Sequence, residues 1–306
     1  MRKYRSLKYQ EVSNKTEQFT RLHCRLPLIK SRSELLAHIE RLSSQEYHKH
    51  RFSLPEPTME AVEEALRREA ESGDMPEIML SSTAQDYADE YCEREYSSKH
   101  SQWETAQKSF ESTESMDRTD LDERRAAELE ELRQSLDADH EYIERQADIA
   151  VKEIPLPYTL PASAEVHGGS VLIEAEMPGI DVIPSEQVTA CGRSVRSKTP
   201  KERKLDYVQH VFSTAVYLAG RMFSISPNVR RVEVSMYEGC CDKHGEQALM
   251  CILSAIFRRE DFEGVDWLSP DFSPQKFCEQ AESRFIVTPS GLMRKVRPFT
   301  DDMEEH

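Results

Sequence analysis

Two glutamates on one expected strand are the first residues whose spacing could support chemistry. Glu174 and Glu176 lie two positions apart in the run Val171–Met177, and alternate residues of a strand face the same side. Paired carboxylates can hold a divalent cation, or divide the roles of general acid and general base. A metal-dependent nuclease would also favour a lysine nearby, and none follows them in that run. A solvated strand face is the simpler interpretation of the pair.

A row of polar residues at helical spacing is the second candidate, and its members are Asp206, His210, Ser213, Tyr217 and Arg221. Steps of three and four residues place them along one edge of a helix. Such an edge could border a cleft in which His210 changes its charge near neutral pH. The simpler interpretation is the wet side of an amphipathic helix. Together the two groups supply four candidate catalytic residues: Glu174, Glu176, His210 and Arg221.

A looser pattern pairs arginine with histidine. Arg203 and His210 have the spacing found in a class of helical ribonucleases, in which both side chains contact the scissile phosphate. The same loose spacing recurs at Arg41/His48, Arg94/His100 and Arg133/His140. Because one chain matches the pattern so often, the match carries little information.

A cysteine-rich turn contains residue types that bind zinc, namely Cys240, Cys241 and His244. A structural zinc site needs four ligands, usually in two spaced pairs, and no second pair is evident in the sequence. The sequence also has no Walker loop and no GxGxxG, GxSxG or HExxH motif. We therefore expect neither a metal nor a cofactor.

A concentrated basic patch stands out in this acidic chain, and a binding role is its candidate function. The patch consists of Arg193, Arg196, Lys198, Lys201, Arg203 and Lys204. It could bind phosphate or nucleic acid, although it lacks the interleaved aromatic residues of many such sites. It could equally pair with the acidic helix expected at 120–148, within the chain or across a dimer. We favour that pairing.

Length and charge set limits on the architecture and on the partners. A chain of 306 residues predicts two domains, or one domain with a long appendage. The net charge of −16 and the pI near 5.2 argue against a general nucleic-acid or membrane-surface binder. Hydrophobic residues make up 38% of the chain and charged residues 31%, so part of the chain should bury little surface.

Cysteine use and the lack of apolar runs indicate the compartment. The seven cysteines are odd in number and scattered, which is typical of reduced thiols in a cytoplasmic protein. No apolar run approaches the roughly 18–20 residues that span a bilayer. The basic start has no apolar region behind it, so it is not a secretory signal. The sequence thus predicts a cytoplasmic protein without membrane association.

The element with the clearest sequence signals is a helix, and the polar row lies on it. Thr199 and Glu202 form a capping box around Pro200, and this combination predicts a helix start. Apolar residues at steps of three and four then continue as far as Phe223, which is the pattern of an amphipathic helix.

Two strand-like runs follow this helix. Val229–Tyr237 alternates apolar and polar residues, as a half-buried strand does. Residues 248–257 are almost continuously apolar, and their composition alone fits either a helix or a strand. A polar turn separates the two runs, so we expect a hairpin and assign 248–257 to a strand.

The N-terminal half is expected to be elongated. Residues 1–57 have few apolar anchors and should be partly disordered with one short helix. Residues 58–152 should form a charged helical region. A Ser/Thr-rich patch at 109–119 should interrupt that region. Its heptad seam is thin and consists of Leu129, Leu132, Leu136, Ile143 and Ala150. We favour a long helical hairpin or a helix that gains a partner. A solvated single helix with i,i+4 ion pairs is the alternative.

The C-terminal half is expected to be compact. A proline-rich linker at 153–162 forbids helix, and an α+β domain should follow at 163–299, ahead of an acidic tail at 300–306. The predicted fold class is α+β. A charged long-helix or coiled-coil-like N-terminal half precedes a small C-terminal domain with an antiparallel sheet and packed helices.

The order of signals in the C-terminal half resembles a C-terminal domain of uncharacterised bacterial proteins. In these, an extended helical region precedes a small α+β module. The resemblance is carried by Leu172–Pro178 with the Ile-Asp-Val-Ile-Pro that follows, by Val229–Ser235, by Arg258–Phe262 ahead of Val265-Asp-Trp, and by Gly291–Phe299. It implies an α+β fold and a strand at 248–257, and it transfers no active site.

Two functions from different classes fit these features. The first is a bacterial cytoplasmic interaction or scaffold protein, with a helical region for assembly and an α+β domain that binds a partner. Its partners would be another protein or a second copy of the chain, reached through the helical region, with nucleic acid unlikely on charge grounds. The alternative is a hydrolase or nuclease of a bacterial defence or mobile-element system, using Glu174, Glu176 or the edge around His210.

Overall fold

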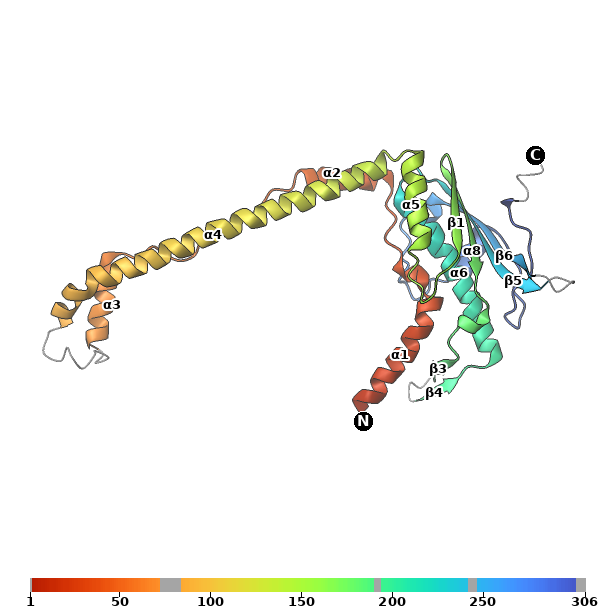
Figure 1. The fold of residues 1–306 in the computed structure, drawn as a ribbon, viewed down its shortest axis with the longest axis horizontal. Coiled ribbons are helices and arrows are strands. Elements are labelled where there is room, and N and C mark those ends of the chain that lie inside the picture. Colours follow the sequence, from red (N-terminus) through yellow and green to blue (C-terminus); the bar gives the residue numbers. More distant parts are fainter. Residues whose placement is uncertain (1, 72–83, 190–193, 242–246, 301–306) are drawn as a thin grey trace. The chain divides into compact units, whose positions relative to one another are not determined.

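A computed structural model describes residues 2–71, 84–189, 194–241 and 247–300 (Figure 1). The chain divides into two compact units. Residues 1–40 and 131–306 form the first, called here the α+β unit. Residues 41–130 form the second, called here the helical unit. The coarse α+β class is confirmed, since helices accompany a mixed sheet. The predicted boundary at 153–162 differs from this division, because residues on both sides of it belong to the α+β unit.

A five-stranded sheet organises the α+β unit. Its order is β1-β2-β5-β6-β7. The strands are β1 (Ala162–His167), β2 (Ser170–Met177), β5 (Arg231–Cys241), β6 (Gln247–Arg258) and β7 (Glu282–Phe285). The sheet is mixed and not antiparallel as predicted, because β2 and β5 pair in parallel. A long helical crossover joins these two strands, and parallel neighbours require such a connection.

The strand predicted at 248–257 is confirmed as β6, which pairs antiparallel with β5. Both of its faces are covered, which explains why its sequence is apolar without alternation. The segment that ends at Phe299 lies along one face, where the Phe299 amide donates to Ser254 Oγ at 3.1 Å. The Val296 amide donates to the Cys251 carbonyl at 2.9 Å. Between β2 and β5, two short strands, β3 (Glu186–Val188) and β4 (Val195–Ser197), form a separate antiparallel pair.

The helix α6 (Pro200–Ile225) lies against the sheet and is the most buried helix of the α+β unit (Figure 1). Residues from all of its faces are buried, including Phe212, Ala219 and Tyr217. The prediction of a solvent-exposed edge on this helix is therefore wrong. Helices cover that edge, because α6 contacts α1 (Arg2–Thr20), α5 (His140–Lys152) and α8 (Pro274–Gln280) as well as the strands.

The capping box of α6 is confirmed and gives a first testable prediction. Thr199 Oγ1 accepts from the Glu202 amide at 3.2 Å, and Glu202 Oε2 accepts from the Thr199 amide at 2.8 Å. We expect Thr199→Ala to lower the free energy of unfolding by about 1 kcal/mol, because it leaves a helix amide without its partner. Urea denaturation would measure the loss, with Thr199→Ser as the matched control that keeps the cap. Equal losses in both variants would contradict the role of the hydroxyl.

Much of the N-terminal segment is helical and part of it packs on α6, whereas one short helix was expected within residues 1–57. It forms α1 (Arg2–Thr20), a 3-10 turn η1 (Leu22–Arg25) and α2 (Arg32–Ser43). Leu22, Leu26 and Ile29 are buried in the same core as α6. These few anchors suffice because α6 and the loop around Trp267 supply the rest of the apolar surface.

The helical unit is built on α4 (Ala84–Leu136), a single helix of 53 residues whose last turns belong to the α+β unit. A long helix was predicted, and its coarse form is confirmed. The expected interruption at 109–119 is wrong. Thr113 Oγ1 donates to the Ser109 carbonyl at 3.0 Å and Thr119 Oγ1 to the Ser115 carbonyl at 2.9 Å. Hydroxyls that bond back by one turn are compatible with a continuous helix.

An extended segment, called here the strap (residues 44–58), lies along α4. Its Phe52 packs against Phe110 at a centroid distance of 5.3 Å and against Trp103 at 6.1 Å. Trp103 Nε1 donates to the Leu54 carbonyl at 3.1 Å. Beyond the strap, α3 (Met59–Glu71) packs against α4 through a small cluster of Val62, Leu66 and Cys92. Within this unit the long helix therefore packs against the strap and α3 of the same chain.

The predicted heptad seam does not run along one helix. α4 ends at Leu136, and α5 (His140–Lys152) begins after Asp139, which accepts from the Tyr142 amide at 2.8 Å as its N-cap. Beyond the break, Ile143 and Ala150 are buried in the core of the α+β unit, where α5 packs on β1 and α6. The apolar spacing in this part of the seam reflects packing within the unit, and no coiled coil is formed there.

Candidate functional site

The two strand glutamates lie on the side of the sheet away from α6. Glu174 and Glu176 are exposed, while their β2 neighbours Ile173 and Ala175 are buried. Glu174 Oε1 accepts from the Tyr237 hydroxyl at 2.9 Å. The two glutamates, with Tyr237 and Leu249, line an open hollow of about 520 Å³. Both carboxylates face the same side, as predicted, and their surroundings are those of a solvated strand face.

His210 lies on the opposite side of the sheet and is fully buried. Its Nδ1 lies 3.0 Å from the Phe19 carbonyl, so Nδ1 carries the proton, and Nε2 accepts from the Tyr158 hydroxyl at 2.6 Å. Burial lowers the pKa of His210 to about 4, which keeps the ring neutral. This residue fastens α1 and Tyr158 to α6. It does not meet Glu174.

The other members of the polar row on α6 are also used in packing. Asp206 pairs with Lys198 Nζ at 2.7 Å, and the same ammonium donates to Thr16 Oγ1 at 2.9 Å. Ser213 and Tyr217 are buried beneath the N-terminal segment, and Arg221 is half-buried. In the described part of the chain, these members of the row therefore serve packing within the α+β unit.

Half of the predicted basic patch is neutralised within the α+β unit. Arg196 pairs with Glu202, and Lys198 pairs with Asp206. Arg203 lies 3.6 Å from Asp181 and donates to the Ile180 carbonyl. These three charges have acidic partners other than those of the helix at 120–148. Lys201 and Lys204 also belong to the described part of α6, and Arg193 lies outside the described residues.

The cysteine-rich turn is only partly described. Cys240 is half-buried, whereas the side chain of Cys241 and all of His244 lie outside the described part of the chain. Among the described residues, no group of three or more His, Cys, Asp and Glu side chains is placed to hold a metal. In that same part of the chain, no helix has the length and apolar character needed to cross a membrane.

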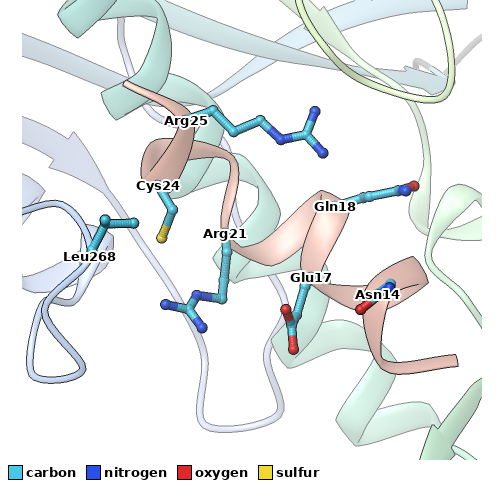
Figure 2. Close-up of a pocket in the computed structure, with 7 residues that line it drawn as sticks. All are labelled: Asn14, Glu17, Gln18, Arg21, Cys24, Arg25 and Leu268. Atoms are coloured by element: carbon cyan, nitrogen blue, oxygen red, sulfur yellow. The ribbon is translucent and has the colours of Figure 1, made fainter. Parts of the chain in front are cut away.

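A site that the sequence patterns did not indicate lies at η1. Cys24 Sγ is 3.4 Å from His23 Nε2 and donates to the Trp267 carbonyl at 3.3 Å. His23 Nδ1 is in turn 2.9 Å from Ser213 Oγ on α6. The half-buried sulfur borders a hollow of about 400 Å³, shown in Figure 2. The hollow is lined by Asn14, Glu17, Gln18, Arg21, Cys24, Arg25 and Leu268.

His23 contacts Ser213 through two atoms. Ser213 Oγ accepts from the His23 amide at 3.1 Å and lies 2.9 Å from His23 Nδ1. His23 Nε2 faces the sulfur of Cys24. Burial and the nearby charge of Arg21 lower the pKa of His23 to about 4, so the ring is neutral at pH 7.

Arg21 supplies a positive charge at the same place. Figure 2 shows the Cys24 sulfur pointing between Leu268 and Arg21, whereas Arg25 points away from it. A hydrogen bond to the Cys24 sulfur is the main cause that raises the pKa of Arg21. The guanidinium of Arg25 donates to the Pro155 carbonyl at 2.7 Å. The two arginines thus carry the same charge, but Arg21 lies beside the thiol and Arg25 points away from it.

Sequence patterns could not indicate this site, because its parts are scattered along the chain. His23 and Cys24 are adjacent, but Ser213 is 190 positions from His23 and Trp267 is 243 positions from Cys24. An adjacent histidine and cysteine carry no signal by themselves. Comparison with protein-family models, with curated proteins and with solved structures found no match to this chain.

Proposed function

We propose that this chain is an interaction protein whose helical unit binds a basic surface of a partner protein. The observation that carries the proposal is the distribution of charge. Residues 41–130 contain 11 Lys and Arg against 23 Asp and Glu, a net charge of −12 out of −16 for the whole chain. A field of one sign speeds the approach of an oppositely charged partner and selects against others.

The construction of the helical unit supports an interaction role. The strap occupies one side of α4 through Phe52 and Leu54, and acidic side chains elsewhere on the helix are exposed to solvent. The exposed set includes Glu104, Glu111, Asp117, Asp120 and Glu123. A rigid helix that displays its charges at fixed positions loses little conformational entropy on binding.

Ion pairs within α4 do not neutralise this surface. Arg118 and Arg125 both lie near Asp122, and Arg124 lies 3.9 Å from Asp120. Exposed pairs of this kind contribute little to stability and are screened by salt. Since acidic residues outnumber basic ones about two to one in the unit, a negative excess remains for a partner.

The hydrolase or nuclease alternative receives less support from the geometry. Glu174 and Glu176 line an open hollow on one side of the sheet, and His210 is buried on the other side as a packing residue. A role of the α+β unit in binding a second partner stays a prediction.

A photo-crosslinking experiment in cells that produce the chain tests the proposal. A crosslinking residue at Thr105 or Ser112 on α4 is expected to capture a basic protein, whereas one at Ser290 in the α+β unit is not. The triple variant Glu104→Lys, Glu111→Lys, Asp117→Lys should abolish the capture. A matched triple reversal of exposed residues in the α+β unit, at Glu165, Asp271 and Glu279, should leave it intact. Capture that survives the first triple variant would contradict the proposal.

The attachment of the strap to α4 gives a second testable prediction about the helical unit. Glu114, nearly buried on α4, accepts from the Tyr47 hydroxyl at 3.1 Å, from the His50 amide at 3.0 Å and from His50 Nδ1 at 2.7 Å. We expect Glu114→Ala to raise the rate of tryptic cleavage after Lys49 and Arg51 on the order of tenfold, because the strap loses its central acceptor.

Glu111 provides the control for this experiment. It lies one turn away on the same helix, and its exposed carboxylate receives a hydrogen bond from Gln107 within α4. Glu111→Ala should leave the rate of tryptic cleavage in the strap unchanged. If both variants are cleaved alike, charge loss on α4 and not the Glu114 anchor controls the strap.

A further inference from the structure

We propose that the outer edge of β1 is a docking site for an extended peptide segment with basic residues at alternate positions. The segment adds a further strand to the sheet, and its basic side chains lie on the acidic face that β1 and β2 share. The inference concerns the α+β unit and is independent of the partner surface on the helical unit. It rests on the register of β1 and on the charge of the adjoining face.

β1 ends the sheet, and β2 is its one partner among the described strands. The Glu176 amide donates to the Pro161 carbonyl at 2.8 Å, which fixes the phase of the antiparallel ladder. Hydrogen-bonded residues alternate along such a ladder, so every second residue of β1 directs its amide and carbonyl away from β2. The outward set is Ala162, Ala164 and Val166. Within the described ranges, no other backbone group bonds to this set, which leaves it available to an added strand.

The two faces of β1 differ. α5 packs against the strand, and Val166 is buried in the same core as Ile143 of α5. On the opposite face, Ser163, Glu165 and His167 are exposed. Side chains alternate along an added strand as they do along β1, so every second one comes to lie on the exposed face.

The exposed face is acidic. It carries Glu165 from β1 and Glu174 and Glu176 from β2. A lysine beside Glu165 on an added strand meets that carboxylate directly, and the exposed contact of Glu165 with His167 at 3.6 Å is weak and screened by solvent. Glu174 lies opposite Ser163 in the register, so a lysine beside this small residue can reach across it to Glu174. Alternate basic residues therefore match the spacing of the carboxylates.

The hollow of about 520 Å³ lies at this place on the face, and it has an apolar wall as well as an acidic one. It is lined by Ser163, Glu174 and Glu176, and also by Tyr237 and Leu249. Leu249 is 53% exposed, although it is a large apolar side chain. The alkyl stem of a lysine or arginine can pack on Leu249 and Tyr237 while its charge reaches the carboxylates. The hollow therefore suits a long basic side chain.

Charge favours a basic segment over a second copy of this chain. Two copies joined edge to edge through β1 about a two-fold axis would bring their glutamate faces side by side, and each chain has a net charge of −16. Like charges on neighbouring strands repel. The opposite edge strand, β7, has only four residues and carries Arg284, which disfavours a basic segment there. The charge pattern therefore selects β1 and a basic occupant.

The probe is the peptide Lys-Val-Lys-Val-Lys-Val with blocked ends, added to the full-length chain. At saturation it is expected to slow the hydrogen exchange of the outward amides Ala162, Ala164 and Val166 about tenfold, as measured by NMR. The amides of Ser163 and Glu165 point to β2 and should change little. Binding that leaves the outward amides unprotected would overturn strand addition. Protection in the free chain that rises with its concentration would identify a second copy as the occupant, and it would also overturn the proposal.

Two methylated forms of the peptide test the backbone bonds without any change to the protein. One carries N-methyl groups on its lysines and the other on its valines. Alternate amides of a strand point in opposite directions, so only one of the two sets faces β1. One form should therefore lose binding, and the other should keep the affinity of the parent peptide. Equal affinities of the two forms would overturn the proposal.

Glu174→Gln and Glu282→Gln supply a matched pair of variants. Glu174→Gln should weaken peptide binding about threefold to fivefold, the size of an exposed charge contact, and it keeps an acceptor for the Tyr237 hydroxyl. Glu282→Gln removes the same charge from an exposed position on β7 and should leave the affinity unchanged. Equal weakening in both would show attraction by net charge alone, and it would overturn the proposal.

The helical unit provides the last control, because its acidic surface could also attract the peptide. The triple variant Glu104→Lys, Glu111→Lys, Asp117→Lys should leave the protection of the outward β1 amides unchanged. This result separates the docking site on β1 from the partner surface on the helical unit. Loss of the protection in the triple variant would overturn the assignment to β1.

Discussion

Lowering the pH from 6.5 to 4 is expected to reduce the free energy of unfolding of the α+β unit by about 3 kcal/mol for each of two buried histidines. Burial lowers the pKa of both His23 and His210 from 6.5 to about 4 in the folded chain. In the unfolded chain the pKa of both rings returns to the ordinary value of 6.5. Between these limits the unfolded state binds protons that the folded state does not. The stabilisation is therefore complete above pH 6.5 and is lost as the pH falls through 4.

The two histidines are expected to be sensitive for the same reason. A proton added to His210 would go to Nε2, because Nδ1 already donates to Phe19, and the Tyr158 hydroxyl would then have to change from donor to acceptor. A proton added to His23 would add a charge beside Arg21. In both cases the folded chain must either bury an extra charge or release the N-terminal segment from α6.

Urea denaturation at several pH values between 7 and 4 would measure the effect. The quantity to compare is the change in the free energy of unfolding with pH. His210→Gln should flatten that change relative to the wild type, whatever its own stability. His167→Gln is the control, since His167 is exposed and lies on β1. A pH dependence of His210→Gln equal to that of the wild type would contradict the assignment.

The elements that could be predicted from the sequence are those whose signals are local. The capping box at Thr199, the alternation in β5 and the apolar run of β6 each lie within a dozen residues, and each element forms where it was expected. The polar strand face of Glu174 and Glu176 could be predicted for the same reason. Side chains of a strand alternate between its two faces, and this alternation does not depend on distant contacts.

What could not be predicted depends on contacts between distant segments. The row from Asp206 to Arg221 has the spacing of a wet helix edge, yet α1 and η1 cover it, through contacts such as His210 with Phe19 across 191 positions. Polar side chains on a helix can face solvent or other polar groups, and spacing does not distinguish the two. The parallel pairing of β2 with β5 also depends on a crossover and leaves no mark in either strand.

The heptad seam shows how a genuine signal can be outweighed. Leu136, Ile143 and Ala150 repeat at seven-residue steps, but Asp139 stands between them and caps a new helix. An aspartate is a good N-cap and a poor seam residue, so the break was readable. The Cys24 site had no comparable signal, because its hydrogen-bond partners come from α6 and from the loop at Trp267.

Truncation of Phe262 is expected to have a large effect on stability. Phe262 is fully buried and touches four aromatic rings. Its centroid lies 4.9 Å from Phe223, 5.0 Å from Phe277, 5.3 Å from Trp267 and 5.5 Å from Phe257. We expect Phe262→Ala to lower the free energy of unfolding by about 3–5 kcal/mol, since it removes the apolar contacts and leaves a cavity among rigid rings. That is a large share of the roughly 5–15 kcal/mol typical of a domain.

Leu268→Ala is the control for this prediction, because Leu268 follows Trp267 and its side chain is 66% exposed. It should cost little in urea denaturation, and Phe262→Leu should fall between the two. If Phe262→Ala costs no more than Leu268→Ala, the aromatic cluster does not contribute the stability assigned to it.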